Sequence, residues 1–226
     1  MRHQPGIGSL FLSRARRFAA AAGLAAALTF ALAAPARAAE GDGLYGRLDG
    51  DLDLRLEAGG AFARGGPALA AGVTALYLQT GGLYAHYTDA LGSTGPAVTR
   101  SVAVGALVTP LFLARYGKDM QYGGPYPDML LDSIGLEIGA FWDAPRGGTF
   151  SSIPGLEIAA VASVPLFPRA SGLFLGVRGA LRFRADAMGG IATGDLLDRG
   201  AVLSVTLSWH QIVQVHLVDA GDELPR

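Results

Sequence analysis

One stretch of the sequence, residues 44–58, alternates without interruption between two kinds of side chain. The apolar and glycine series is Leu44, Gly46, Leu48, Gly50, Leu52, Leu54, Leu56 and Ala58; the polar series is Tyr45, Arg47, Asp49, Asp51, Asp53, Arg55 and Glu57. Since successive side chains on a strand point to opposite faces, this pattern predicts one strand with an apolar face and a charged face. Fifteen residues exceed the roughly 5–6 of an ordinary strand. They suit a tilted strand that crosses a bilayer, which needs about 9–11 residues within the hydrocarbon.

The N-terminus has the features of a secretory signal. A cluster of arginines precedes the uncharged, apolar residues 18–34, and Ala36, Arg37 and Ala38 have the A-x-A form of a cleavage site. We therefore predict a signal peptide over residues 1–38, with an uncleaved N-terminal anchor as the alternative. We expect residues 39–218 to form one domain and residues 219–226 to be a disordered tail.

Composition limits what the exported part can be. Five of the 18 basic residues and none of the 19 acidic residues lie in the first 38 positions, so the remainder has a net charge of −6. This balance argues against a nucleic-acid partner, which would favour a basic face. The chain has no Cys, which excludes disulfides and thiolate metal sites. After the signal, no stretch is long and apolar enough for a membrane helix, so further contact with a membrane would have to come from strands.

Alternation and turn-forming residues divide the exported part into strands and loops. We predict eight strands and no amphipathic helix; the strands are residues 44–58, 68–80, 83–89, 98–113, 131–142, 155–166, 172–185 and 201–218. Gly81 and Gly82 are expected to form a tight turn, and residues 115–128 are the least strand-like region. The loops expected to face outward are residues 59–67, 91–96, 143–154 and 186–200.

Alternation does not itself say which face meets lipid, because a soluble lipocalin-type barrel alternates too. The long terminal strands and the Leu, Val, Ala and Ile of the apolar series favour an all-β, eight-stranded, antiparallel up-and-down transmembrane barrel. With its signal peptide, Gly-rich loops and absence of Cys, the chain resembles the small outer-membrane β-barrel proteins of Gram-negative bacteria. The resemblance implies a monomer in outer-membrane lipid. Two features depart from that pattern: the chain continues past Leu217 to Arg226, and residues 115–128 would form an unusually long periplasmic turn.

In this arrangement the polar series would point into a narrow lumen. We expect an ionic network there, because isolated buried charges are costly. Its members would be Arg47, Asp49, Asp51, Asp53, Arg55, Glu57, Glu137, Glu157, Arg178, Arg182 and Arg184. The acidic residues of the first strand are expected to pair with the three arginines of the seventh. A small ion-conducting path is the alternative.

Other chemistry has weaker support. Asp49, Asp51 and Asp53 have the spacing that begins a calcium loop, without the required Gly and distal Glu. Ser208 and His210 share one strand face, and some outer-membrane lipid hydrolases use a Ser/His pair, but the sequence identifies no orienting acid or oxyanion site. We therefore expect no catalytic site, cofactor or metal.

The sequence predicts an exported outer-membrane barrel with a structural or interaction role, and it points to no particular protein partner. The alternatives are a soluble periplasmic barrel that binds a small apolar ligand, and an outer-membrane lipid-modifying enzyme.

Overall fold

The structure, a computed structural model, describes residues 45–63, 66–91, 98–118, 120, 124–145, 147–184 and 199–215. All of them belong to one compact unit, Ala36–Arg226. The expected signal peptide, residues 1–38, and the expected tail, residues 219–226, lie outside the described residues.

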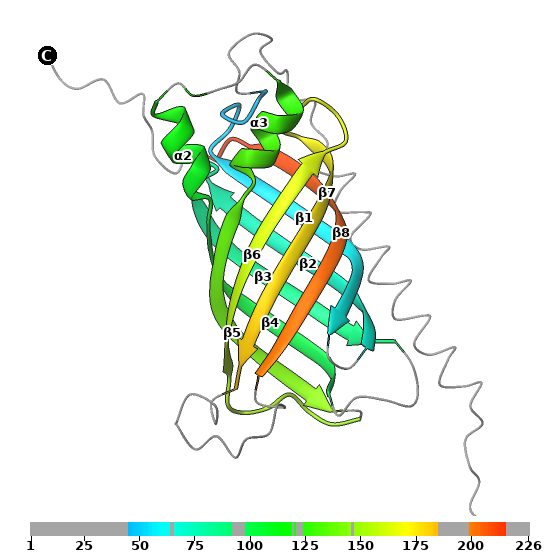
Figure 1. Cartoon of the computed structure of the whole chain (residues 1–226). Helices are drawn as coiled ribbons and strands as arrows, with labels where there is room; N and C mark the ends of the chain where they lie inside the picture. The colour runs from blue at the N-terminus through cyan, green and yellow to red at the C-terminus, as the bar shows by residue number, and fades with distance from the viewer. Residues whose placement is uncertain are drawn as a thin grey trace, which may run out of the picture. The chain divides into compact units, whose positions relative to one another are not determined.

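Eight antiparallel strands close into a barrel in sequence order, with the last strand paired to the first (Figure 1). The strands are β1 (Leu52–Ala63), β2 (Gly66–Tyr77), β3 (Gly81–Ala90), β4 (Val98–Val108), β5 (Gly135–Pro145), β6 (Gly155–Pro165), β7 (Gly172–Phe183) and β8 (Arg199–Val213). The register between β1 and β8 runs from Leu52 opposite Val213 to Ala63 opposite Val202. Closure leaves no strand edge unpaired, as a membrane-spanning sheet requires.

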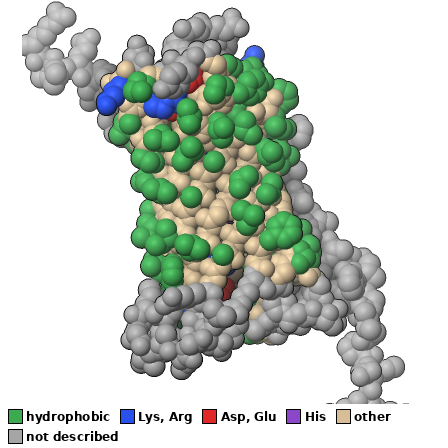
Figure 2. Space-filling view, in the orientation of Figure 1, with side chains coloured by type: hydrophobic (Ala, Val, Ile, Leu, Met, Phe, Trp, Pro, Cys, Tyr) green, Lys and Arg blue, Asp and Glu red, His purple; other side chains and the backbone are tan. Residues whose placement is uncertain are grey.

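The wall of the barrel is apolar outside and polar inside. Outward-facing Leu83, Ile138 and Leu181 are 69%, 56% and 55% exposed. Figure 2 shows hydrophobic side chains spread over the visible wall. Inward-facing Glu157 and Glu137 are only 0% and 2% exposed. Water would favour the reverse distribution, whereas lipid favours apolar side chains outside and charges withdrawn into the lumen. The predicted fold class, an all-β, eight-stranded, antiparallel up-and-down barrel, is confirmed.

Two short helices correct the prediction that the exported part has no amphipathic helix. They are α2 (Pro110–Tyr116) and α3 (Pro125–Asp132), and both lie between β4 and β5. Each starts with a proline, whose fixed φ and missing N–H suit the first helical turn. The sequence placed residues 98–113 in one strand, with Pro110 marking its end or an irregularity, but β4 ends at Val108. Among the described residues, no helix is long and apolar enough to span a membrane.

The strand ends also differ from the prediction. The first strand starts at Leu52, and residues 45–51 form turns and bends ahead of it. Residues 59–67 were expected to be a loop, yet β1 continues to Ala63 and β2 begins at Gly66. The turn expected at Gly81 and Gly82 lies at residues 78–80, and both glycines belong to β3. Gly82 has no room for a side chain, because a Cβ there would lie 1.8 Å from the carbonyl oxygen of Ala75.

The two ends of the barrel are different. At one, here called the helix end, lie residues 45–51, the turn at 78–80, both helices and residues 166–171 (Figure 1). At the other, the loop end, β3 and β5 finish and β4 and β6 begin. The long segment between β4 and β5 therefore leaves the strand count intact and folds at the helix end.

Candidate functional site

The eleven charged residues predicted to share the lumen occupy three places. Seven lie on strands and point inward: Asp53, Arg55, Glu57, Glu137, Glu157, Arg178 and Arg182. Arg184 directly follows β7 at the loop end. Arg47, Asp49 and Asp51 lie in the turns that precede β1, not on a strand.

The centre of the lumen holds a chain of ion pairs, here called the lumen cluster: Glu57, His86, Glu137, Glu157, Arg178 and Arg182. Arg178 donates from Nε to Oε2 of Glu137 at 2.7 Å and also pairs with Glu157. Arg182 donates from Nε to the other oxygen of Glu157 at 2.5 Å. Each buried carboxylate therefore has a guanidinium partner, as stability in a low-dielectric interior requires.

His86 connects β1 to this chain. Its Nδ1 lies 2.7 Å from Oε1 of Glu57, and its Nε2 lies 3.3 Å from Oε1 of Glu137. Thr206 of β8 donates to the second oxygen of Glu57 at 3.0 Å. When both ring nitrogens carry hydrogen, both can donate to the carboxylates that face them. His86 was not among the charged residues that the sequence placed in the network.

The partners in the lumen differ from those predicted. The acids of β1 were expected to pair with the arginines of β7, but β8 separates those two strands. Arg182 instead lies directly opposite Glu157 in the register of β6 and β7. Asp53 pairs with Arg55 on its own strand at 2.8 Å.

At the loop end, Arg184 pairs with Asp143 at 2.9 Å. The sequence had assigned Asp143 to a loop, whereas it lies within β5.

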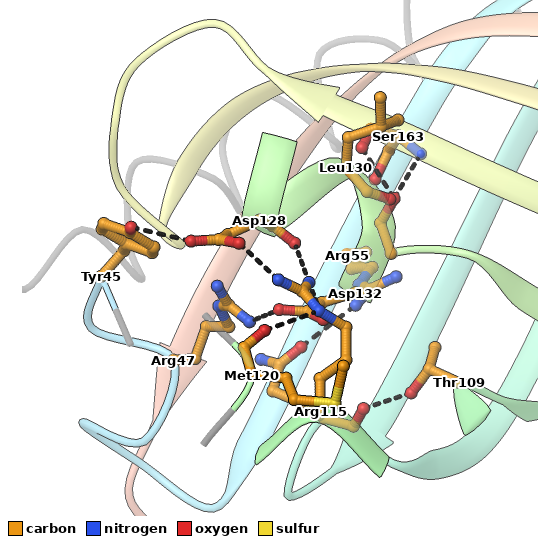
Figure 3. A network of polar contacts seen from close by, with 12 residues as sticks. Tyr45, Arg47, Arg55, Thr109, Arg115, Met120, Asp128, Leu130, Asp132 and Ser163 are labelled. Carbon is orange, nitrogen blue, oxygen red and sulfur yellow. Dashed lines mark hydrogen bonds and ion pairs between the residues drawn. The ribbon is translucent and has the colours of Figure 1, made fainter. Parts of the chain in front are cut away.

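A second group of charges closes the helix end (Figure 3). In this cap cluster, made of Tyr45, Arg47, Arg115, Asp128 and Asp132, Arg115 contacts Oδ1 of Asp132 at 2.6 Å and also pairs with Asp128. Arg47 pairs with Asp132 from the segment before β1. Two arginines thus balance two aspartates, and Asp128 is fully buried.

Further hydrogen bonds fix the helices in position. Tyr45 donates its hydroxyl to Asp128 at 3.1 Å, and burial together with this bond raises the pKa of Tyr45 above its usual value. Ser133, just after α3, donates to the carbonyl oxygen of Ser163 at 2.7 Å and accepts from its N–H at 2.8 Å. At the other end of the segment, Thr109 donates to the carbonyl oxygen of Gln79. The helices are therefore tied to the barrel at both ends.

Sequence reasoning missed Arg115, Asp128 and Asp132. They lie in a region without strand periodicity, and the two helices are too short for their spacing to stand out. The two prolines at the helix starts, Pro110 and Pro125, are the signal that would have indicated helices there.

The cavities found along the lumen are small. One of about 50 Å³ lies beside Glu57 and Arg178, one of about 30 Å³ lies between Arg55 and Asp132, and one of about 10 Å³ lies beside Arg182. Each has room for water molecules but falls far below the roughly 300–1,000 Å³ of ligand pockets. A larger cavity of about 500 Å³ lies at the loop end, where Arg184 and Ile153 contribute to its lining.

Ser208 and His210 also face the lumen. Ser208 Oγ lies 3.0 Å from Nε2 of His210, whose ring stacks on Phe174 with centroids 3.9 Å apart. Within the described part of the chain, no hydrogen bond or ion pair joins His210 to a carboxylate.

The three aspartates considered for calcium do not form a row. Asp49 and Asp51 precede β1, and Asp53 points inward toward Arg55. No group of three or more His, Cys, Asp or Glu residues suited to a metal occurs among the residues described.

Comparisons with known proteins give a distant structural likeness. No family model matches the sequence, and no curated protein matches it. Among solved structures, the chain is similar to that of Neisserial surface protein A, with 13% identity and a TM-score of 0.38 over 70% of this chain and 96% of the other. The closed barrel of eight strands, with an apolar wall and charges inside, is itself the architecture of the small outer-membrane barrels.

Proposed function

We propose that the protein is an integral outer-membrane barrel that spans the bilayer as a monomer and serves a structural or interaction role. The observation that carries this proposal is the reversed polarity of the wall. Glu157 and Glu137 are buried inside it, and Ile138 and Leu181 are more than half exposed outside it. A soluble barrel that carried an apolar ligand would instead need apolar side chains within its interior.

The lumen supports a closed barrel rather than a pore. Arg178 reaches across it to Glu137, Arg182 pairs with Glu157 on the neighbouring strand, and the cap cluster lies over the helix end. The cavities of about 50, 30 and 10 Å³ are sized for water molecules. The structural or interaction role is then carried by the outer surface of the barrel rather than by its lumen. We infer that the loop end faces outward and the helix end faces the periplasm.

Fractionation tests the location. Expressed in a Gram-negative host, the protein is expected in the outer-membrane fraction, resistant to carbonate extraction, with an electrophoretic mobility that changes on heating in detergent. Recovery in the soluble periplasm would contradict the proposal.

Conductance tests the closed lumen. Purified barrel in a planar bilayer is expected to show no steady current. Stable channels in the intact protein would refute the closed lumen while leaving the membrane location standing.

Lipid hydrolysis by Ser208 and His210 is the less favoured candidate. The 3.0 Å contact between them suits a nucleophile and base. Both, however, line a cavity of about 50 Å³ that is too small for an acyl chain and an ester. We expect Ser208→Ala to leave the lipid composition of expressing cells unchanged; loss of a lipid-processing product in that variant would reverse the order of the two candidates.

A further inference from the structure

Helix α2 buries a charged side chain and exposes apolar ones, which is the reverse of a helix on a water-exposed surface. Its buried side chains are Phe112 and the charged Arg115. Its outward side chains include Leu113, which is 59% exposed, and Tyr116, which is 49% exposed. These two are three positions apart and share one helix face. A surface helix in water turns its polar face outward, so the surroundings of α2 must solvate apolar groups.

The apolar face of α2 continues the apolar wall of the barrel. Val108, the last residue of β4, is 50% exposed and lies opposite Leu136 of β5, which is 54% exposed. Only Thr109 separates Val108 from the start of the helix. Figure 1 shows α2 at the rim, next to the end of the barrel wall. The medium that covers the wall therefore extends to the helix.

The turn between β6 and β7 repeats the pattern at the same end. Leu166 and Phe167 are 45% and 59% exposed. Exposed Arg169 follows Phe167 by two residues, as exposed Lys118 follows Tyr116. An aromatic ring beside a cation suits the border of a membrane, where the ring lies at headgroup level and the long cationic side chain reaches the phosphates.

We propose that the apolar rim, defined as Leu113, Tyr116, Leu166 and Phe167, inserts into the headgroup region of the leaflet at the helix end, with Lys118 and Arg169 on lipid phosphates. The partner is a phospholipid surface. Insertion holds α2 from outside while Arg115 holds it from inside, so the bilayer takes part in keeping the helices over the lumen. The proposal rests on the membrane location of the barrel.

The absence of Cys from the sequence makes the test clean, because each introduced cysteine is the sole labelling site. Leu113→Cys and Phe167→Cys are spin-labelled, refolded into vesicles of phosphatidylcholine and phosphatidylglycerol, and probed with oxygen and a water-soluble nickel complex. Val205→Cys on the outer wall is the lipid control, and Ser152→Cys at the loop end is the water control. Heat-modifiable mobility verifies folding. Tyr116→Cys replaces Leu113→Cys if that variant does not fold.

The expected result is a loss of nickel accessibility at Leu113 and Phe167 relative to Ser152, with a depth about 5–10 Å into the headgroup and acyl boundary. If the rim labels are as open to nickel as Ser152 while Val205 lies in lipid, the rim proposal is overturned and the membrane barrel stands. If Val205 is itself in water, both fail. Rim labels that are water-exposed in vesicles but shielded in cell envelopes would assign the rim to a protein partner and also overturn the proposal.

Discussion

Arg178 of β7 reaches across the lumen and donates to Glu137 of β5 at 2.7 Å. Strand β6 lies between them in the wall, so this contact spans the interior rather than following the sheet. The same guanidinium pairs with Glu157 on β6. One side chain thus compensates two carboxylates that are almost inaccessible to water.

Removal of that guanidinium should be strongly destabilising. Arg178→Met leaves Glu137 and Glu157 with fewer partners, and breaking a buried pair from one side costs about 3–5 kcal/mol. We expect a loss of this size in the free energy of unfolding, measured by urea titration of the barrel in vesicles. The double variant Arg178→Met with Glu137→Gln should recover part of it. An Arg178→Met barrel as stable as the parent would mean that the pairing contributes nothing.

Gly72 tests the contact between Glu57 and His86. A Cβ at this position would lie 2.3 Å from Oε1 of Glu57 and 2.5 Å from Nδ1 of His86. Gly72→Ala should therefore push the two side chains apart and cost about 1–3 kcal/mol, as overpacking does. Gly60→Ala is the matched control, because nothing lies within 4 Å of its added methyl group. Equal unfolding midpoints for the two variants would argue against a tight lumen.

The cap cluster should hold the helices against proteolysis. Asp132 accepts from Arg47 and Arg115, so Asp132→Ala weakens the link between the segment before β1 and both helices. We expect faster cleavage of residues 109–134 in limited proteolysis while the strands remain protected. Ser152→Ala, at an exposed site of the loop end, serves as the control. If Asp132→Ala is cleaved no faster than Ser152→Ala, the cluster does not fix the cap.

A substitution in the turn between β2 and β3 should raise the stability of the barrel. Leu78 and Gln79 have φ values of 46° and 56°, in the left-handed region that L-residues disfavour. Leu78→Asn should raise the stability by about 1 kcal/mol, because asparagine tolerates this conformation. Leu83→Asn, at an exposed strand position, provides the comparison and should be no more stable than the parent. Urea titration of the parent and the variants compares their free energies of unfolding. A Leu78→Asn barrel that is less stable than the parent would show that the turn is not strained.

A charged side chain on the outer wall should reduce the fraction of barrel that folds into vesicles. Val205→Arg places a guanidinium on the outer face of β8, where lipid contact costs about 2–4 kcal/mol near the bilayer midplane. Ser152→Arg, exposed at the loop end, should have little effect. The folded fraction after refolding into vesicles reports the difference. Similar yields for the two variants would indicate that water covers the wall.

Period-two alternation was enough to find the eight strands and the faces of the wall. The long unbroken pattern before Ala58 was misleading at its start, because residues 45–51 alternate as a strand does but form turns. Glycine was misleading too. Gly82 was interpreted as a turn residue, whereas the close approach of β2 is what requires it.

The site was predictable only in part. Inward charges on strands follow from alternation, but their partners depend on register and on distances across the barrel. Arg182 and Glu157 are opposite each other only once β6 and β7 are aligned. Arg115 and Asp132 meet through two short helices that carry no clear periodicity.

The two tryptophans of the chain test the central claim in the unmodified protein. Trp142 on β5 and Trp209 on β8 both belong to the outward-facing series of their strands. In vesicles whose acyl chains carry bromine, we predict strong quenching of tryptophan fluorescence and little quenching by iodide in the water. Quenching by iodide without quenching by brominated lipid would contradict the account, because the apolar wall would then face water.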